Sequence, residues 1–212
     1  MASSGPDALT PRAREIIAAA RDLLEEEGIG ALSMRRLAQR LGIRAPSIYK
    51  HVADKEALEA ALISAGFEEQ AALFERALDS SDDPLAAIAQ AYRDFARRHP
   101  HLYRLMTERP LNRELLVPGS EARAAGPLYE AAGGSLDLAR AAWAFAHGMI
   151  ILELNGRFPA DADLDAAWQR GIAALKPHRD PEASVMLTPK QPHSDAEASP
   201  VADAAFRPRS RP

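Results

Sequence analysis

The stretch SMRRLAQRLGIRAPSIYKHVADK, Ser33 to Lys55, decides the fold of this chain. Ser33 can cap a first helix, because its hydroxyl can accept a hydrogen bond from an amide in the helix's first turn. The apolar residues that follow recur at helical spacing and form one stripe, made of Met34, Leu37, Ala38 and Leu41. Gly42 can adopt the left-handed conformation that ends a helix, and Pro46 suits the first turn of a second helix over residues 45–52. The pattern predicts two short helices joined by a glycine turn.

This helix pair is basic, whereas the whole protein is acidic. Residues 33–55 contain six Lys or Arg and one acid, Asp54, so their net charge is +5. The full chain of 212 residues has a formal net charge of -4. A compact basic helix pair within an acidic protein is typical of a DNA-binding helix-turn-helix. The acidity elsewhere indicates that any contact with nucleic acid is local.

A longer pattern surrounds the helix pair, at fixed spacing between Gly28 and Leu58. Its members are Gly30, Ser33, Leu37, Ala38, Leu41, Gly42, Ile43, Ser47, Ile48, Tyr49, His51, Val52, Lys55, Glu56 and Leu58. This pattern resembles the N-terminal domain of the TetR/AcrR-type transcriptional regulators. A second segment, WAFAHGMIILELNGRF from Trp143 to Phe158, is similar to a Trp-x-x-x-His-Gly motif in the C-terminal domain of one subgroup of that family.

Ten residues are candidate DNA contacts: Ser33, Arg35, Arg44, Ala45, Pro46, Ser47, Tyr49, Lys50, His51 and Lys55. By its chemistry, Arg44 can form paired hydrogen bonds with a guanine edge. The resemblance implies phosphate contacts by Tyr49, His51 and Lys55, and base or groove contacts at the helix entrance. The alternative interpretation is a structural helical hairpin whose charges are only solvated.

Amphipathic stretches separated by glycine and proline predict an all-α fold. The helices are expected at 11–27, 34–41, 45–52, 55–78, 84–98, 101–106, 121–132 (interrupted at Gly126-Pro127), 136–154 and 164–175. The resemblance implies an N-terminal three-helix domain joined by a long helix to a C-terminal ligand-binding and dimerisation bundle. The expected divisions are a disordered N-terminus at 1–9, a helix-turn-helix domain at 10–55, a C-terminal domain at 56–177 and a disordered Pro-rich tail at 178–212.

The last two expected helices carry more apolar surface than an internal core needs. We therefore expect a subunit interface there, for which the candidates are Ile151, Leu154, Trp168, Ile172 and Leu175. The resemblance implies that these helices pair with those of a second subunit in a four-helix bundle. Candidate ligand-binding residues are Tyr92, Phe95, Tyr103, Met106, Trp143 and His147. Packing in an ordinary core is the alternative for these residues, and the expected ligand is small and mostly apolar.

Composition and motifs exclude several classes of protein. The chain has no cysteine, which excludes disulfides, thiolate metal sites and cysteine nucleophiles. Its six histidines lack the spacing of a metal site, and we expect neither metal nor cofactor. No nucleophile motif, phosphate-binding glycine loop or paired carboxylate points to an enzyme. No apolar run approaches the roughly 20 residues of a membrane span, and no signal peptide is visible.

These observations predict a cytoplasmic protein, and the resemblance implies a bacterial one that associates with the nucleoid when it binds DNA. We expect a homodimeric, sequence-specific transcriptional regulator, and specifically a repressor that an unidentified small-molecule effector releases from a near-palindromic operator. One alternative is a regulator that binds DNA constitutively, without a ligand. The other is an all-helical small-molecule-binding protein or enzyme.

Overall fold

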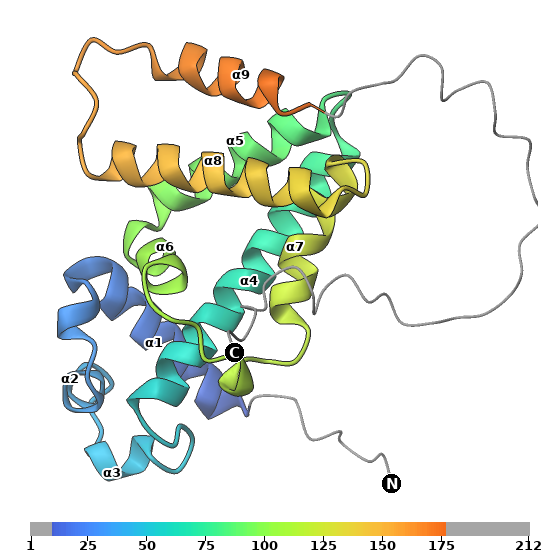
Figure 1. The fold of residues 1–212 in the computed structure, drawn as a ribbon. Coiled ribbons are helices and arrows are strands. Elements are labelled where there is room, and N and C mark those ends of the chain that lie inside the picture. The colour runs from blue at the N-terminus through green and yellow to red at the C-terminus, as the bar shows by residue number, and fades with distance from the viewer. Residues whose placement is uncertain (1–9, 177–212) are drawn as a thin grey trace, which may run out of the picture. The chain divides into compact units, whose positions relative to one another are not determined.

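The computed structural model describes residues 10–176, and within them it is helical with no strand (Figure 1). The predicted all-α fold is confirmed. The helices are α1 (Pro11–Glu27), η1 (Ile29–Ala31), α2 (Met34–Arg40), α3 (Ala45–Ile48), α4 (Lys55–Asp79), α5 (Pro84–Arg98), α6 (Pro100–Thr107), η2 (Arg113–Leu115), α7 (Ser120–Ala131), α8 (Leu136–Leu154) and α9 (Leu164–Ala174). The predictions for residues 1–9 and 178–212 lie outside the described residues.

The chain divides into two compact units. Among the described residues, the first unit holds 10–70 and 94–120, and the second holds 71–93 and 121–176. Helices α4 and α5 therefore each contribute residues to both units. The two units are defined by which residues pack together, and not by what the residues do. The predicted boundary between a DNA-binding domain and a C-terminal domain, at residues 55 and 56, therefore stays a prediction.

Side-chain caps set the helix ends in the first unit. The Thr10 hydroxyl accepts a hydrogen bond from the Ala13 amide at 3.1 Å, and Pro11 occupies the first turn of α1. Gly28, at φ 79°, ends that helix. Asp54 caps α4, because its Oδ1 accepts from the Ala57 amide at 2.8 Å. A hydroxyl or carboxylate at the start of a helix and a glycine at its end are the residue types that cap helices most often.

Carboxylates tie α1, α4 and α6 together in the first unit. Glu25 of α1 accepts from the backbone amides of His101 and Leu102, at 3.3 and 3.0 Å, in the first turn of α6. Glu69 of α4 lies 3.3 Å from both Arg21 of α1 and His99, the residue that precedes α6. A carboxylate at a helix N-terminus satisfies free amides and complements the helix dipole. The N-terminal helix is thus fixed to the start of α6.

A buried arginine joins three helices of the second unit. Arg93 of α5 is 5% exposed and donates to Glu153 of α8 at 3.1 Å and to Asp165 of α9 at 2.6 Å. Its guanidinium also lies over the Trp168 ring, 5.3 Å from the centroid, and Glu153 accepts a second hydrogen bond from the Trp168 indole. Burial opposes the charge of Arg93, but the hydrogen bonds to the two carboxylates outweigh it and raise the pKa of Arg93.

Replacing Arg93 by methionine is expected to lower the free energy of unfolding by about 3 kcal/mol, because the nearly buried Glu153 carboxylate loses its charged partner. Urea unfolding, followed by circular dichroism, measures this change. The matched control is Arg170→Met, on the exposed part of α9, which should leave stability nearly unchanged. Equal effects of the two substitutions would show that the buried pairing contributes nothing.

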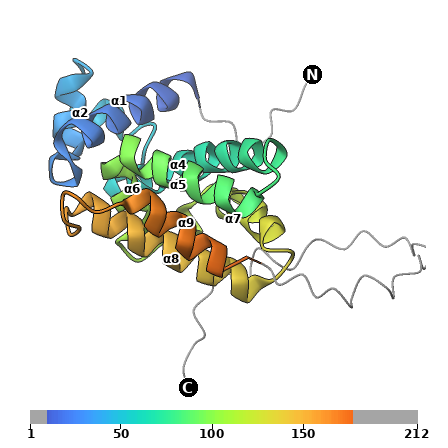
Figure 2. The ribbon, with the colours of Figure 1, turned by 90° about the horizontal axis from the view of Figure 1, so that it is seen from above.

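Close packing brings α8 and α9 side by side, as Figures 1 and 2 both show. A Cβ atom built on Gly171 of α9 would overlap the ring of Phe145 of α8. That ring also packs edge-on against Trp168, with the centroids 5.7 Å apart. The absence of a side chain at residue 171 therefore sets the distance between the two helices.

We expect Gly171→Ala to lower the free energy of unfolding by about 1–3 kcal/mol, because the added methyl group displaces Phe145 from its rotamer. Gly30→Ala is the control, since a Cβ there would meet nothing within 4 Å. Thermal denaturation of both variants tests this. An unchanged melting temperature for Gly171→Ala would mean that the ring has room to move.

Two helix predictions need correction. The second helix of the pair was predicted over 45–52, but α3 ends at Ile48. Beyond it the His51 and Val52 amides both donate to the Ile48 carbonyl, at 2.8 and 3.0 Å, so a tightened turn replaces the last helical turn. The helix over 121–132 was predicted to break at Gly126-Pro127, whereas α7 runs through Pro127. Gly126 has no Cβ to clash with the proline ring, which removes the usual obstacle to a helix before proline.

Candidate nucleic-acid interface

The turn between α2 and α3 has the geometry that a helix-turn-helix requires. Ser33 caps α2 by accepting from the Arg36 amide at 3.3 Å. Gly42 has φ 64°, the left-handed region that favours glycine. Its amide donates to Gln39 at 3.1 Å, and the Ile43 amide donates to Ala38 at 3.0 Å. This pair of bonds is a Schellman motif, and it directs the chain into α3.

Helix α3 buries one side chain and leaves the others available. Ile48 is fully buried, and Val52 beyond the helix is 7% exposed, whereas Tyr49 is 52% exposed. None of the ten predicted DNA contacts is buried. Ser33, Ala45 and Ser47 are half-buried, and the exposed ones are Arg35, Arg44, Pro46, Tyr49, Lys50, His51 and Lys55. The predicted contacts thus lie on the outer surface of the first unit.

The structure separates the basic residues of this region into two groups. Arg36 is paired with Glu27 of α1, and Arg40 makes two hydrogen bonds of 2.6 Å to Glu26 of the same helix. The hydrogen bond from Arg40 lowers the pKa of Glu26. These two arginines hold α2 against α1.

The second group has no carboxylate to neutralise it. The side chains of Arg35, Arg44 and Lys50 make no hydrogen bond or ion pair with any other residue between 10 and 176. Lys55 is intermediate, because its ammonium lies 3.6 Å from Glu59, beyond hydrogen-bond distance. Exposed cations without an internal partner are suited to bind phosphate or a base edge. The sequence alone could not distinguish the two groups, because the pairing depends on α1.

The predicted ligand residues fall into both compact units. In the second unit, the Trp143 indole donates to the Tyr92 hydroxyl at 3.1 Å, and Trp143 stacks on His147 with centroids 6.0 Å apart. Phe95, Tyr103 and Met106 belong to the first unit, where all three are buried. The structure therefore links three of the six predicted residues to one another directly, and their role in ligand binding stays a prediction.

The predicted dimerisation residues differ in how much surface they offer. Trp168 and Ile172 are 5% and 4% exposed, so they pack mainly within their own subunit. Ile151, Leu154 and Leu175 are half-buried. Leu152 was not among the predicted dimerisation residues, yet it is 41% exposed on α8. It follows Gly148 and Ala144 on one face at a spacing of four residues, which was a usable signal.

Two further properties of residues 10–176 bear on function. No helix in that range is long and apolar enough to cross a membrane. Nor do three or more histidine, aspartate or glutamate side chains there gather into a cluster that could hold a metal ion.

Comparisons with known proteins agree with this geometry. The family model described as bacterial regulatory proteins, tetR family, matches residues 16–62, and the model described as Tetracyclin repressor-like, C-terminal domain, matches residues 85–175. An uncharacterized HTH-type transcriptional regulator of Mycobacterium tuberculosis, Rv0681, is 30% identical over 170 residues, which is 76% of this chain and 78% of that protein.

A tetracycline repressor and a TetR variant of known structure are also similar. The class A repressor from transposon 1721 of Escherichia coli is 40% identical over 92 residues, 40% of this chain and 43% of the repressor. The crystal structure of a TetR variant from Acinetobacter baumannii AYE, in complex with minocycline, superposes with a TM-score of 0.53 and 25% identity. That superposition covers 76% of this chain and 91% of the other.

Proposed function

The chain belongs to the TetR family of bacterial transcriptional regulators, which bind DNA and are not enzymes, and we propose that it is a homodimeric, sequence-specific repressor. In this proposal residues 10–55 read an operator on the bacterial chromosome, and residues 56–177 provide the dimer contacts and a ligand site. A small, mostly apolar effector relieves the binding to the operator.

The single observation that carries DNA recognition is the set of unpaired cations around α3. Arg44 and Lys50 are exposed and free of carboxylates within the described residues, next to the half-exposed Tyr49. Tyr49 and Lys50 contact phosphates in this proposal, together with Ser33, Arg35, His51 and Lys55. Arg44, Ala45, Pro46 and Ser47 enter the major groove. Because Ala45 and Pro46 form few directional bonds with bases, phosphate contacts supply most of the affinity.

Dimerisation in this proposal uses the exposed face of α8 and the adjoining edge of α9. Ala144, Gly148 and Leu152 form a stripe without charge on α8, and small residues let a second helix approach closely. Ile151, Leu154 and Leu175 extend that surface at its margins, and Trp168 and Ile172 support it from beneath. A two-fold axis places two α3 helices one turn of DNA apart, about 34–36 Å, so the operator is a near-palindrome.

The effector site in this proposal includes Tyr92, Trp143 and His147, and Trp143 already contacts each of the other two. Phe95, Tyr103 and Met106 of the first unit are proposed as ligand contacts on the sequence alone. The similar A. baumannii TetR variant is described in complex with minocycline, which supports a ligand for this chain but does not identify it. An effector relieves DNA binding only if it prefers the non-binding conformer, with a coupling of about 1–3 kcal/mol.

Selection from a pool of random duplexes tests sequence recognition and identifies the operator in the same experiment. The full-length protein is expected to enrich sites composed of two inverted half-sites whose centres lie about 10 base pairs, or a multiple of that, apart. In a parallel selection, the Arg44→Ala variant should show no base preference. It should still bind DNA weakly and in a salt-sensitive way, through its phosphate contacts. An unenriched pool after repeated rounds would contradict sequence-specific binding.

A further inference from the structure

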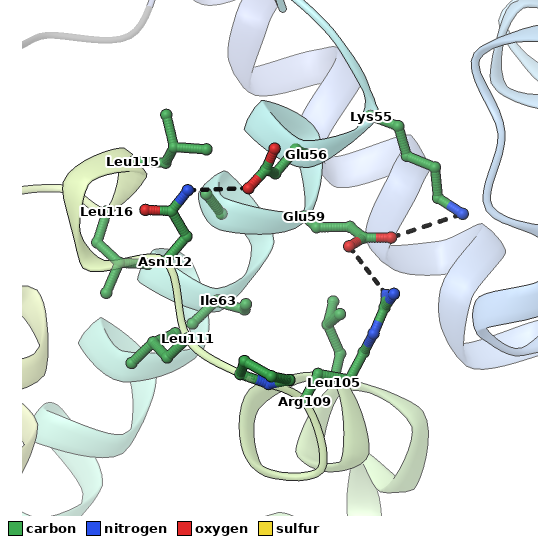
Figure 3. A pocket seen from close by; sticks show the side chains of 12 residues that line it. Lys55, Glu56, Glu59, Ile63, Leu105, Arg109, Leu111, Asn112, Leu115 and Leu116 are labelled. Atoms are coloured by element: carbon green, nitrogen blue, oxygen red, sulfur yellow. Dashed lines mark hydrogen bonds and ion pairs between the residues drawn. The ribbon is translucent and has the colours of Figure 1, made fainter. Parts of the chain in front are cut away.

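A cavity of about 380 Å³ lies in the first unit, beside the first two turns of α4 (Figure 3). Helix α4 lines one side, and the segment from Leu105 to Leu116, which includes the end of α6 and the loop after it, lines the other. None of the predicted ligand residues lines this cavity. Its apolar wall consists of Ala60, Ile63, Leu105, Leu111, Leu115 and Leu116. A volume of this size is within the range of small-molecule sites.

The polar side of the cavity is centred on one carboxylate. Figure 3 shows Glu59 between Lys55 and Arg109. Its Oε2 accepts a hydrogen bond from Arg109 at 3.0 Å. Its Oε1 is buried and ion-paired with the Lys55 ammonium at 3.6 Å, but no donor among the described residues lies within hydrogen-bond distance of it. Glu56, the other acid at the cavity, is exposed and accepts a bond from Asn112 at 2.9 Å.

A carboxylate oxygen that has an ion pair but no hydrogen bond defines what the cavity can bind. A ligand that displaces the Lys55 ammonium and donates an N–H to this buried oxygen gains a charge-assisted hydrogen bond. Lys55 and Arg109 do not favour an anion, because both already face Glu59 and an anion would have to displace the carboxylate from them. A cationic head group next to an apolar body fits both walls.

We propose that this cavity binds a small amphiphilic ammonium ion, which takes the place of the Lys55 ammonium at Glu59 Oε1, donates an N–H to that oxygen and packs its apolar part on Ile63, Leu105 and Leu111. The ligand's positive charge competes with Lys55 for Glu59. Lys55 is also one of the proposed phosphate contacts, so a bound ammonium leaves Lys55 available to DNA. That consequence for DNA rests on the proposed function, whereas the binding site itself does not.

Three probes that share a phenyl ring and differ in head group test the site: 2-phenylethylammonium, 2-phenylethanol and 3-phenylpropanoate. Calorimetric titration of the full-length protein without DNA is expected to give a dissociation constant for the ammonium about tenfold or more below that of the alcohol and of the carboxylate. Equal affinities for the three probes, or no binding of any, would overturn the proposal. Because DNA is absent, failure of the proposed repressor function would not affect this result.

Variants assign the preference to Glu59. Glu59→Gln should abolish the preference for the ammonium. The control Glu15→Gln, which changes an exposed carboxylate of α1 paired with Arg12, should retain it.

Lys55→Met removes the competing cation and should tighten ammonium binding severalfold. Unchanged affinity in this variant would contradict the proposed competition between Lys55 and the ligand. If Glu59→Gln does not fold, Leu111→Trp, which fills the cavity and leaves Glu59 in place, should abolish binding. Retained binding in Leu111→Trp overturns the site.

Discussion

Alanine at both Tyr49 and Lys50 is expected to weaken operator binding by about 100-fold or more while the protein stays folded. Each contact with DNA contributes about 1–3 kcal/mol, and each is lost from both half-sites in a dimer. The fold should be unaffected because both side chains are exposed, and that of Tyr49 is 52% exposed. The Lys50 side chain also forms no hydrogen bond or ion pair within the described residues. Fluorescence anisotropy with the selected duplex measures the affinity, and circular dichroism verifies the fold.

The control for this prediction is Arg97→Ala, which removes one exposed positive charge from α5. It should change affinity little, because long-range charge alone is screened at physiological salt. Lys50→Ala should also reduce the slope of log K against log salt by about 2 per dimer, one for each lost phosphate contact. If the double variant bound the operator with wild-type affinity, Tyr49 and Lys50 would not be part of the DNA interface.

Glutamate at Leu152 is expected to dissociate the dimer, raising its dissociation constant about 10⁴-fold. The two-fold axis introduces the charge twice, and each buried, unpaired charge costs about 3 kcal/mol or more. Leu152 is 41% exposed in the single chain, so the subunit itself should remain folded. Sedimentation velocity across a concentration series measures the change.

Val117→Glu is the matched control, because Val117 is 45% exposed and belongs to the first unit rather than to α8. That variant should sediment as a dimer. If Leu152→Glu also sediments as a dimer, the exposed face of α8 is not the interface. Weak operator binding by a monomeric Leu152→Glu protein would link dimerisation to DNA recognition.

Local signals predicted most of the fold. The side chains of Thr10, Ser33, Asp54, Ser135 and Asp163 each accept an amide hydrogen bond from the first turn of the helix that follows. Such caps depend on residues three positions apart, so a sequence displays them directly. The glycine turn at residue 42 was predictable for the same reason. Both family-model matches agree with the resemblance drawn from the helix-turn-helix pattern.

Contacts between distant segments were not predictable. Arg35 and Arg36 are adjacent and equally basic, yet the structure pairs only Arg36 with α1. The cavity beside α4 needs the loop after α6 to fold back onto Glu59, across about 50 residues of sequence, and no periodicity encodes that approach. The burial of Trp168 likewise depends on Arg93, Phe145 and Glu153, which come from two other helices.

The most direct test of the central claim is a titration of the full-length protein against its selected duplex and against a scrambled duplex of equal length and composition. Fluorescence anisotropy at two salt concentrations would measure both affinities. A sequence-reading dimer should bind the selected duplex about 10³-fold more tightly than the scrambled one, and both affinities should fall steeply as salt rises. Equal, weak affinity for the two duplexes at both salt concentrations would contradict a sequence-specific regulator.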